Sequence, residues 1–191
     1  VSYDDEIVVC GEKLFQTEHI YIMLNKPCGV VSASNDKRDK TVVDILPDEL
    51  KRKNLFPAGR LDKDTVGFCL ITDDGEFAHN ILSPSKHVTK TYIARLSNSI
   101  DYEKSKKSFS EGVVLADGTV LLSAVLVELE AGDKPLYKVI IKQGKYHQVS
   151  RMMASRNMTV TYLERREEGT LKLGDLPQGQ VRQLDENEVA D

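Results

Sequence analysis

Continuous and alternating runs of apolar residues along the chain predict strands more often than helices. The nearly continuous apolar run at residues 20–25 suits a buried strand, and the turn residues Lys-Pro-Cys-Gly at 26–29 end it. We expect residues 30–33 to resume the sheet. Further strands are predicted at 7–10, 67–72, 90–96, 119–130 and 136–142.

Four other segments have the pattern of helices: 41–46, 76–82, 101–109 and 147–156. In the first, Thr41 followed three residues later by Asp44 resembles a capping box. In the last, Val149, Met152 and Met153 recur at helical spacing and predict the buried face, so the polar side chains of that helix point elsewhere.

The turn signals between these strands indicate the fold class. Asp117-Gly118 and Gly132-Asp133 are typical of hairpins, which join antiparallel strands. No Rossmann or P-loop glycine pattern occurs. We therefore expect an α+β fold with a mainly antiparallel mixed sheet and flanking helices.

Length and composition indicate one main domain with a sizeable core. The chain has 191 residues, of which 40% are hydrophobic and 29% charged, as in ordinary globular proteins. Residues 1–16, with a short strand and a turn at Gly11, are too few to stand alone and read as the end of another unit. The main domain is expected at 17–191.

Several classes of protein are not supported. No apolar stretch approaches the ~20 residues of a membrane-spanning helix, and the acidic start of the chain lacks the order of a signal peptide. Cys10, Cys28 and Cys69 are widely separated, and the four histidines form no paired motif, so neither a disulfide framework nor a metal site is indicated. We expect a cytoplasmic protein with no cofactor, no metal and no membrane partner.

The distribution of charge is more informative than its total. The net charge of −4 argues against a protein that coats nucleic acid through bulk positive charge. Residues 134–156, however, carry six basic residues and no acidic one, while residues 184–191 carry four acids. One face is therefore able to bind phosphates.

Candidate chemistry lies in the basic, glycine-bounded loop between two apolar segments, where Asp62 occupies the centre of Gly-Arg-Leu-Asp-Lys-Asp-Thr-Val-Gly at 59–67. Taken alone, Asp62 is more often a turn residue than a catalytic one. The complete string 59–67, together with three further segments in the order found in a known family, instead favours a catalytic role for Asp62.

Those segments resemble the RsuA family of pseudouridine synthases: Lys-Pro with Gly29, the loop 59–67, Lys-Thr-Tyr at 90–92, and Gly-Lys-Tyr-His-Gln-Val with Arg-Met at 144–152. The resemblance runs from about Ile20 to Leu184. Residues 21–27 and Ser83-Pro84 are most similar to the branch that acts on small-subunit ribosomal RNA. The resemblance to the family implies the pseudouridine synthase catalytic fold. Residues 1–16 then look like the tail of an S4-like RNA-binding domain and its linker.

The resemblance also implies roles for the two central side chains. Asp62 is the essential carboxylate, either attacking ribose C1′ or removing a proton at C2′, and both routes stay open. Tyr92 stacks on the uracil and lies near C5, where a proton must leave. The uridine is flipped into a pocket, at an unstacking cost of a few kcal/mol.

The same resemblance implies a set of substrate-binding residues. Arg60 is expected to take the space that the flipped base vacates, and His147 and Gln148 to buttress the pocket. Phosphate contacts are expected from Lys26, Lys90, Lys145 and Arg151. The implied partner is small-subunit ribosomal RNA or an assembly intermediate, bound by a monomer.

Two departures from the family pattern stand out. Ser150 occupies the position of an Arg or Lys whose charge pairs with the catalytic aspartate. An opposite charge within about 4 to 6 Å lowers an aspartate pKa by roughly 1 to 3 units. Arg151 cannot simply substitute, because adjacent helix positions differ by about 100°. We therefore hypothesise weakened activity, and equal turnover after Ser150→Lys would contradict this. The acidic segment 165–169 is the second departure.

Two other functions remain open at this stage. Ser150 favours an RNA-binding or ribosome-assembly module that has lost turnover. A carbohydrate-active enzyme with Asp62 and Asp64 as paired acids fits the same glycosidic chemistry, although residues two apart in a loop need not converge. Activity on a free glycoside would be needed to support that reading.

Overall fold

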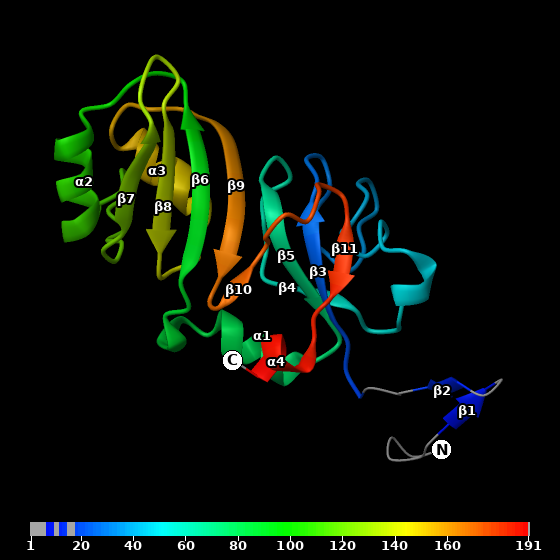
Figure 1. The fold of residues 1–191 in the computed structure, drawn as a ribbon. Helices are drawn as coiled ribbons and strands as arrows, with labels where there is room; N and C mark the ends of the chain where they lie inside the picture. Colours follow the sequence, from blue (N-terminus) through cyan, green and yellow to red (C-terminus); the bar gives the residue numbers. More distant parts are fainter. Residues whose placement is uncertain (1–6, 10–11, 15–17, 191) are drawn as a thin grey trace.

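The computed structural model describes residues 7–9, 12–14 and 18–190, and Figure 1 shows its ribbon. Its main sheet has nine strands in the order β11-β3-β5-β9-β6-β8-β7, with β4 paired to β5 and β10 to β9. Their bounds are β3 Tyr21–Lys26, β4 Phe56–Ala58, β5 Val66–Thr72, β6 Lys90–Leu96, β7 Val125–Glu130, β8 Leu136–Ile141, β9 Val160–Glu168, β10 Leu171–Lys172 and β11 Val181–Gln183.

All the pairings of this sheet are antiparallel except that between β5 and β9, which is parallel. The helices are α1 Gly75–Leu82, α2 Tyr102–Glu111, α3 Gln148–Ala154 and α4 Glu186–Ala190, with 3-10 turns at Asp48–Leu50 and Pro84–Lys86. The predicted α+β class with a mainly antiparallel mixed sheet is confirmed.

Strands β3 and β5 owe their place to apolar side chains on both faces. Ile22 and Leu24 point into the larger core, whereas Met23, Phe68 and Leu70 belong to a second cluster with α1 and the C-terminal segment. Because successive side chains of a strand alternate between faces, a continuous apolar run indicates burial on both sides.

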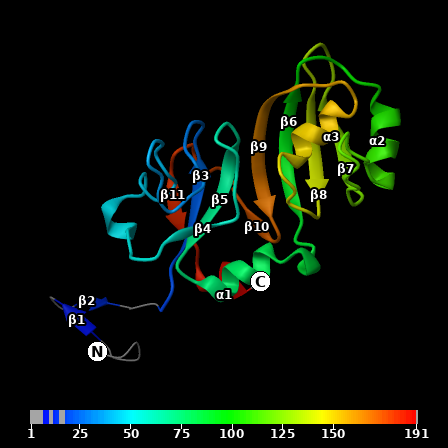
Figure 2. The ribbon, with the colours of Figure 1, turned by 180° about the vertical axis from the view of Figure 1, so that it is seen from behind.

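Strand β9 joins the two halves of the sheet. It pairs with β5 in parallel at Val66↔Glu164 and Gly67↔Arg165, and with β6 in antiparallel register along most of its length. Figures 1 and 2 show β9 between the β3–β5 part and the β6–β8 part from both sides. The sequence pattern did not predict this strand, the longest in the main sheet.

The helices occupy the edges and one face. Helix α2 lies beside β7 at one edge, and Figure 2 shows α3 in front of β6 and β8. Phe109 of α2 and Met152 of α3 both enter the larger core. Among the described residues, no helix is long and apolar enough to cross a membrane.

Three predicted elements differ from the structure. Residues 30–33 form no strand, and only Val31 makes an isolated bridge, with Thr41. The capping bonds predicted for Thr41 and Asp44 are present, yet residues 42–45 form turns rather than a helix. The strand expected at 119–130 begins only at Val125, because the preceding residues form a bridged loop around Gly118.

The expected N-terminal unit, 1–16, lies partly outside the described residues. Its described parts, β1 Ile7–Val9 and β2 Glu12–Leu14, form a separate two-stranded antiparallel sheet. The assignment of this segment to an S4-like domain therefore stays a prediction.

Candidate active site

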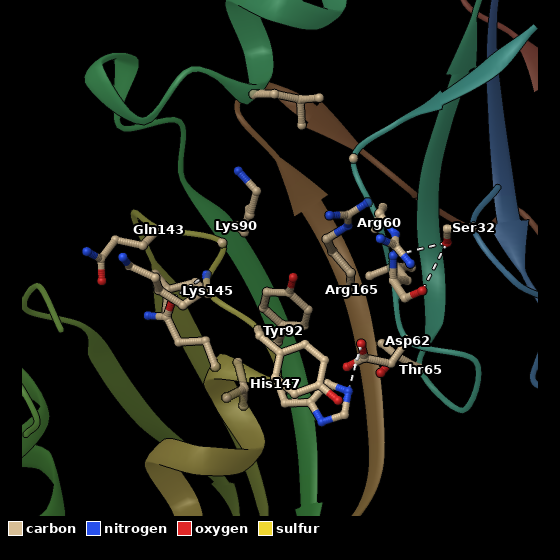
Figure 3. A pocket seen from close by; sticks show the side chains of 18 of the residues that line it. Ser32, Arg60, Asp62, Thr65, Lys90, Tyr92, Gln143, Lys145, His147 and Arg165 are labelled. Carbon is tan, nitrogen blue, oxygen red and sulfur yellow. Dashed lines mark hydrogen bonds and ion pairs between the residues drawn. The ribbon is translucent and has the colours of Figure 1, made fainter. Parts of the chain in front are cut away.

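A cavity of about 980 Å³ lies between loop 59–65, strand β6 and the β8–α3 loop at 142–147 (Figure 3). This volume lies within the roughly 300–1,000 Å³ of ligand pockets in proteins. Seven of the nine predicted site residues line it: Asp62, Tyr92, Arg60, Lys90, Lys145, His147 and Gln148. The other two, Lys26 and Arg151, do not.

A glycine sets the position of loop 59–65 against β9. Gly67 has φ of 102°, and a Cβ atom built on it would lie 2.2 Å from the carbonyl oxygen of Arg165. Only glycine accommodates both the conformation and this close approach. The last residue of the predicted motif thus brings the Asp62 loop beside β9.

Lys26 supports the same loop through hydrogen bonds to its backbone. This buried position corrects the prediction that Lys26 contacts a phosphate. Its side chain is fully buried, and its Nζ donates to the carbonyl oxygens of Pro27, Lys63 and Thr65 at 3.2, 3.2 and 2.8 Å. With its donors engaged and no exposure to solvent, the Lys26 ammonium cannot reach an RNA phosphate. Lys26 is a structural support of the Asp62 loop.

Ser32 provides a second support that the sequence did not reveal. The backbone N–H of Leu61 donates to its Oγ at 3.0 Å, and that hydroxyl lies 3.0 Å from the Leu61 carbonyl oxygen, which it reaches as a donor. Asp62 therefore follows a residue, Leu61, whose backbone N–H and C=O are both hydrogen-bonded to the Ser32 hydroxyl. The segment expected to be a strand instead supports the loop that carries Asp62.

Asp62 projects into the cavity, and its side chain is 36% exposed. Burial raises the pKa of Asp62 above its ordinary value, the positive field of His147 opposes that rise, and the negative field of Asp64 adds to it. The Nε2 atom of His147 lies 3.1 Å from Oδ1 of Asp62, a contact drawn as a dashed line in Figure 3.

The partner of Asp62 is thus a histidine. Among the described residues, no Lys or Arg nitrogen forms an ion pair with Asp62, so neither Arg60 nor a relocated lysine takes the place of the cation that the resemblance expects at Ser150. The side chain in contact with Asp62 therefore comes from the loop before α3, which the sequence pattern did not indicate.

Tyr92 lies in β6 and lines the same cavity as Asp62, as Figure 3 shows. The residue is 8% exposed. Burial raises the pKa of Tyr92, while the nearby Arg165 guanidinium lowers it. Tyr92 therefore offers the cavity an aromatic ring and a protonated hydroxyl, the groups expected to meet a base.

A buried cluster of charges lies next to Tyr92. The carboxylate of Glu168 is 3.1 Å from Nζ of Lys90 and 3.3 Å from Nη1 of Arg165, and Arg165 also donates from Nε to the Phe68 carbonyl at 2.8 Å. The side chains of Glu168 and Arg165 are each 1% exposed. The acidic segment at 165–169 thus has a physical explanation: Glu168 neutralises two cations inside the fold.

This cluster changes the interpretation of Lys90. Its side chain is only 12% exposed and its charge is paired with Glu168, so it lines the cavity without offering a free charge to a phosphate. The predicted phosphate contact of Lys90 does not fit this geometry, although the residue stays at the site.

The remaining predicted residues fall into two groups. Arg60 and Lys145 line the cavity and are exposed, so their predicted phosphate-side roles stay predictions. Gln148 is buried and accepts from the backbone N–H of Lys145 at 3.1 Å, which shapes the loop before α3. Arg151 does not line the cavity and pairs instead with Asp117, which does not line it either.

Tyr146 belongs to the motif at 144–152, but the sequence predicted no role for it. It is 74% exposed, lines the cavity and stacks on His147 with ring centroids 3.8 Å apart at 17°. The sequence offered one indication that Tyr146 lies at the site: it directly precedes His147, a predicted pocket residue. Within the described part of the chain, no group of three or more His, Cys, Asp and Glu forms a potential metal site.

Comparison with known proteins gives consistent results. Residues 20–155 match the family model described as RNA pseudouridylate synthase. An uncharacterized RNA pseudouridine synthase of Bacillus subtilis is 43% identical over 187 residues, covering 96% of this chain and 77% of that protein. The ribosomal small subunit pseudouridine synthase A of Escherichia coli is 37% identical over 171 residues, covering 89% and 72%.

A relative with another named substrate is also similar. The ribosomal large subunit pseudouridine synthase B of Bacillus subtilis is 34% identical over 191 residues, covering 99% of this chain and 78% of that protein. A solved structure described as a pseudouridylate synthase has a TM-score of 0.81 and 35% identity, covering 100% of this chain and 81% of its own.

Proposed function

This chain belongs to the RNA pseudouridylate synthase family, as an enzyme of the RsuA type, and we propose that it isomerises one uridine of small-subunit ribosomal RNA to pseudouridine with Asp62 as the essential carboxylate. The observation that supports this most strongly is the joint placement of Asp62 and Tyr92 in one cavity of about 980 Å³. A carboxylate and an aromatic ring are the groups that the reaction requires.

The reaction breaks the bond between ribose C1′ and uracil N1, turns the base and joins C5 to C1′, with no net redox change. Ionised Asp62 serves either as the nucleophile at C1′ or as the base that removes the C2′ proton. Tyr92 stacks on the base and keeps it in the cavity while it turns. Because these atoms are inaccessible within a stacked RNA, the uridine enters flipped out.

The exposed cations at the cavity support the RNA-binding part of the proposal. Arg60 and Lys145 line the cavity and are exposed. In this proposal both contact phosphates, and Arg60 fills the gap left by the flipped base. Phosphate contacts make affinity fall as salt rises. Lys26 contributes to binding only by supporting the Asp62 loop.

The choice of the small subunit is supported by the 37% identical relative named for it, against 34% for the relative named for the large subunit. This margin is narrow, so the substrate test includes both RNAs. Transcripts of each, and particles isolated during assembly, are labelled with tritium at uridine C5 and incubated with the chain. Release from small-subunit RNA, with mapping to one position, is the expected result.

Two variants make this test decisive. Asp62→Asn removes the carboxylate with little change in size, and Asp64→Asn is the matched control two positions along the same loop. We expect release to be lost only in the first. Release by Asp62→Asn would contradict the proposal, and loss in Asp64→Asn with activity on a free glycoside would favour paired acids instead.

A second candidate, an RNA-binding or assembly module without turnover, is favoured by Ser150 alone. It predicts that the wild-type chain binds the RNA with salt-dependent affinity but releases no tritium from any transcript or particle. Its distinguishing result is restored release after Ser150→Lys. Turnover by the wild-type chain rules it out.

A further inference from the structure

The contact between Asp62 and His147 bears on how the ionised state of Asp62 is maintained during the reaction. Asp62 must be ionised to act, yet its partly buried position in the cavity disfavours its charge. The carboxylate therefore needs a positive partner nearby. Because the cavity contains several basic side chains, the question is which of them is placed to supply that charge.

Most of the basic groups near the cavity are already engaged. Lys26 donates to three backbone carbonyls, Lys63 lies 2.7 Å from Asp39, and both Lys90 and Arg165 pair with Glu168. Arg60 and Lys145 are exposed at the opening and form no ion pair with Asp62 in the described part of the chain. His147, at 3.1 Å, is the group in contact.

The local backbone directs the imidazole to that position. His147 adopts a left-handed conformation, with φ of 46° and ψ of 37°, immediately before α3. The preceding turn is closed by Gln148, whose backbone N–H donates to the Lys145 carbonyl at 3.1 Å. Tyr146 then stacks on one face of the imidazole. A conformation that few residues adopt is thus held by several contacts at a functional site.

We propose that protonated His147 is a positioning residue that holds Asp62 ionised and oriented, so that catalysis weakens as the imidazole loses its proton. The proposal rests on Asp62 being the essential carboxylate. A charge-assisted hydrogen bond is roughly twice as strong as a neutral one. Neutral imidazole can still donate one hydrogen bond, so the expected loss is partial, about tenfold.

Other titratable and charged groups around the cavity must be considered. They lie on loop 59–65, on β6, on the β8–α3 loop and on β9: Arg60, Lys63, Asp64, Lys90, Tyr92, Lys142, Lys145, Tyr146 and Arg165. Lysine, arginine and tyrosine side chains ordinarily keep their protons at neutral pH, and aspartate loses its proton well below it. A change of charge between pH 5 and 8 is characteristic of histidine.

His87 provides a matched control within the same cavity. It also lines the cavity and has a left-handed backbone, with φ of 49°, but forms no ion pair with a carboxylate among the described residues. Asparagine tolerates this conformation. His87→Asn and His147→Asn therefore remove one imidazole each at comparable backbone geometry, whereas His147→Lys replaces the titrating charge by one that persists across this pH range.

The test is the single-turnover rate of tritium release from about pH 5 to pH 8. We expect the wild-type rate to fall about tenfold toward the alkaline end. His147→Asn should be slow with no alkaline decline, and His147→Lys should be faster than wild type at the alkaline end. His87→Asn should keep the alkaline decline, whatever its absolute rate. Thermal unfolding of each variant verifies folding.

Two results would overturn the proposal: an alkaline decline retained in both His147 variants, or a wild-type rate that stays level across the range. If His147→Asn fails to fold, the wild-type and His147→Lys profiles decide alone. Asp62→Asn distinguishes a failure of the proposed function from a failure of the His147 proposal. Activity in that variant overturns the assignment of Asp62 as the essential carboxylate. Activity that requires Asp62 but ignores His147 overturns only the positioning role.

Discussion

Two groups of paired side chains, one in the cavity and one beside it, differ in their access to water. In the pair of Asp62 and His147, the side chains are 36% and 41% exposed. In the cluster of Lys90, Glu168 and Arg165, they are 12%, 1% and 1% exposed. The same kind of contact therefore has different consequences: the exposed pair can meet a substrate and change protonation, whereas the buried cluster fixes the fold.

The physical reason is desolvation. Removing charges from water costs several kcal/mol per ion, and the mutual attraction of the ions must offset this. Glu168 achieves this by facing two cations, and the loss of its charge would leave both uncompensated. Asp62 keeps partial contact with water, so its protonation depends on pH and on the nearby charges of His147 and Asp64.

The largest effect is expected from Asp62→Asn, which removes the carboxylate proposed to react. We expect tritium release to fall by about 10³-fold or more, because a single acid–base or nucleophilic group contributes about 10² to 10⁴. The unfolding midpoint in urea should change little. A stability loss as large as that of the buried cluster would show that the exposed pair is structural as well.

Glu168→Gln is expected to have the largest effect on stability. It leaves Lys90 and Arg165 as neighbouring buried cations, and breaking a buried pair in this way costs about 3 to 5 kcal/mol. Urea unfolding measures the change. Glu130→Gln is the control, because the pair of Arg95 and Glu130 is 36% and 57% exposed and should contribute about 0 to 1 kcal/mol. Equal losses would refute the contrast.

Lys26→Met tests whether a buried lysine supports the loop or binds RNA. Three carbonyls lose their donor, so we expect destabilisation of about 1 to 3 kcal/mol. The dependence of RNA affinity on salt should not change. Lys145→Met, at the exposed opening, should lower that slope by about 0.7 to 0.9. A reduced slope in Lys26→Met would restore its phosphate contact.

The smallest effect concerns pH and stability. Burial raises the pKa of Asp62 in the folded state, so the native protein binds this proton more tightly than the unfolded chain. Stability therefore falls as pH rises from about 4, the ordinary range of aspartate. Asp62→Asn should gain stability relative to wild type between pH 4 and pH 7, by less than about 1 kcal/mol because the side chain is partly exposed to solvent. Melting temperatures at both values measure this difference.

Strand β9, which the sequence pattern did not predict, shows why hydrophobic periodicity fails where charged residues are buried. Strand β9 reads Val-Thr-Tyr-Leu-Glu-Arg-Arg-Glu-Glu, in which charges occupy positions that are buried in the fold. Alternation of apolar and polar residues predicts a strand only when one face is apolar. Here Arg165 and Glu168 are buried because they compensate each other, and that pairing also involves Lys90 from another strand.

The sequence by itself determined the α+β class, the apolar strands β3, β5, β6 and β8, helices α1 and α2, and the loop that carries Asp62, because hydrophobic period and turn chemistry are local properties. The tertiary structure alone decided that Lys26 is a support, that Glu168 neutralises two cations and that His147 meets Asp62. Each of these depends on contacts between segments distant in sequence, where burial, rather than residue type, sets the behaviour of a charge.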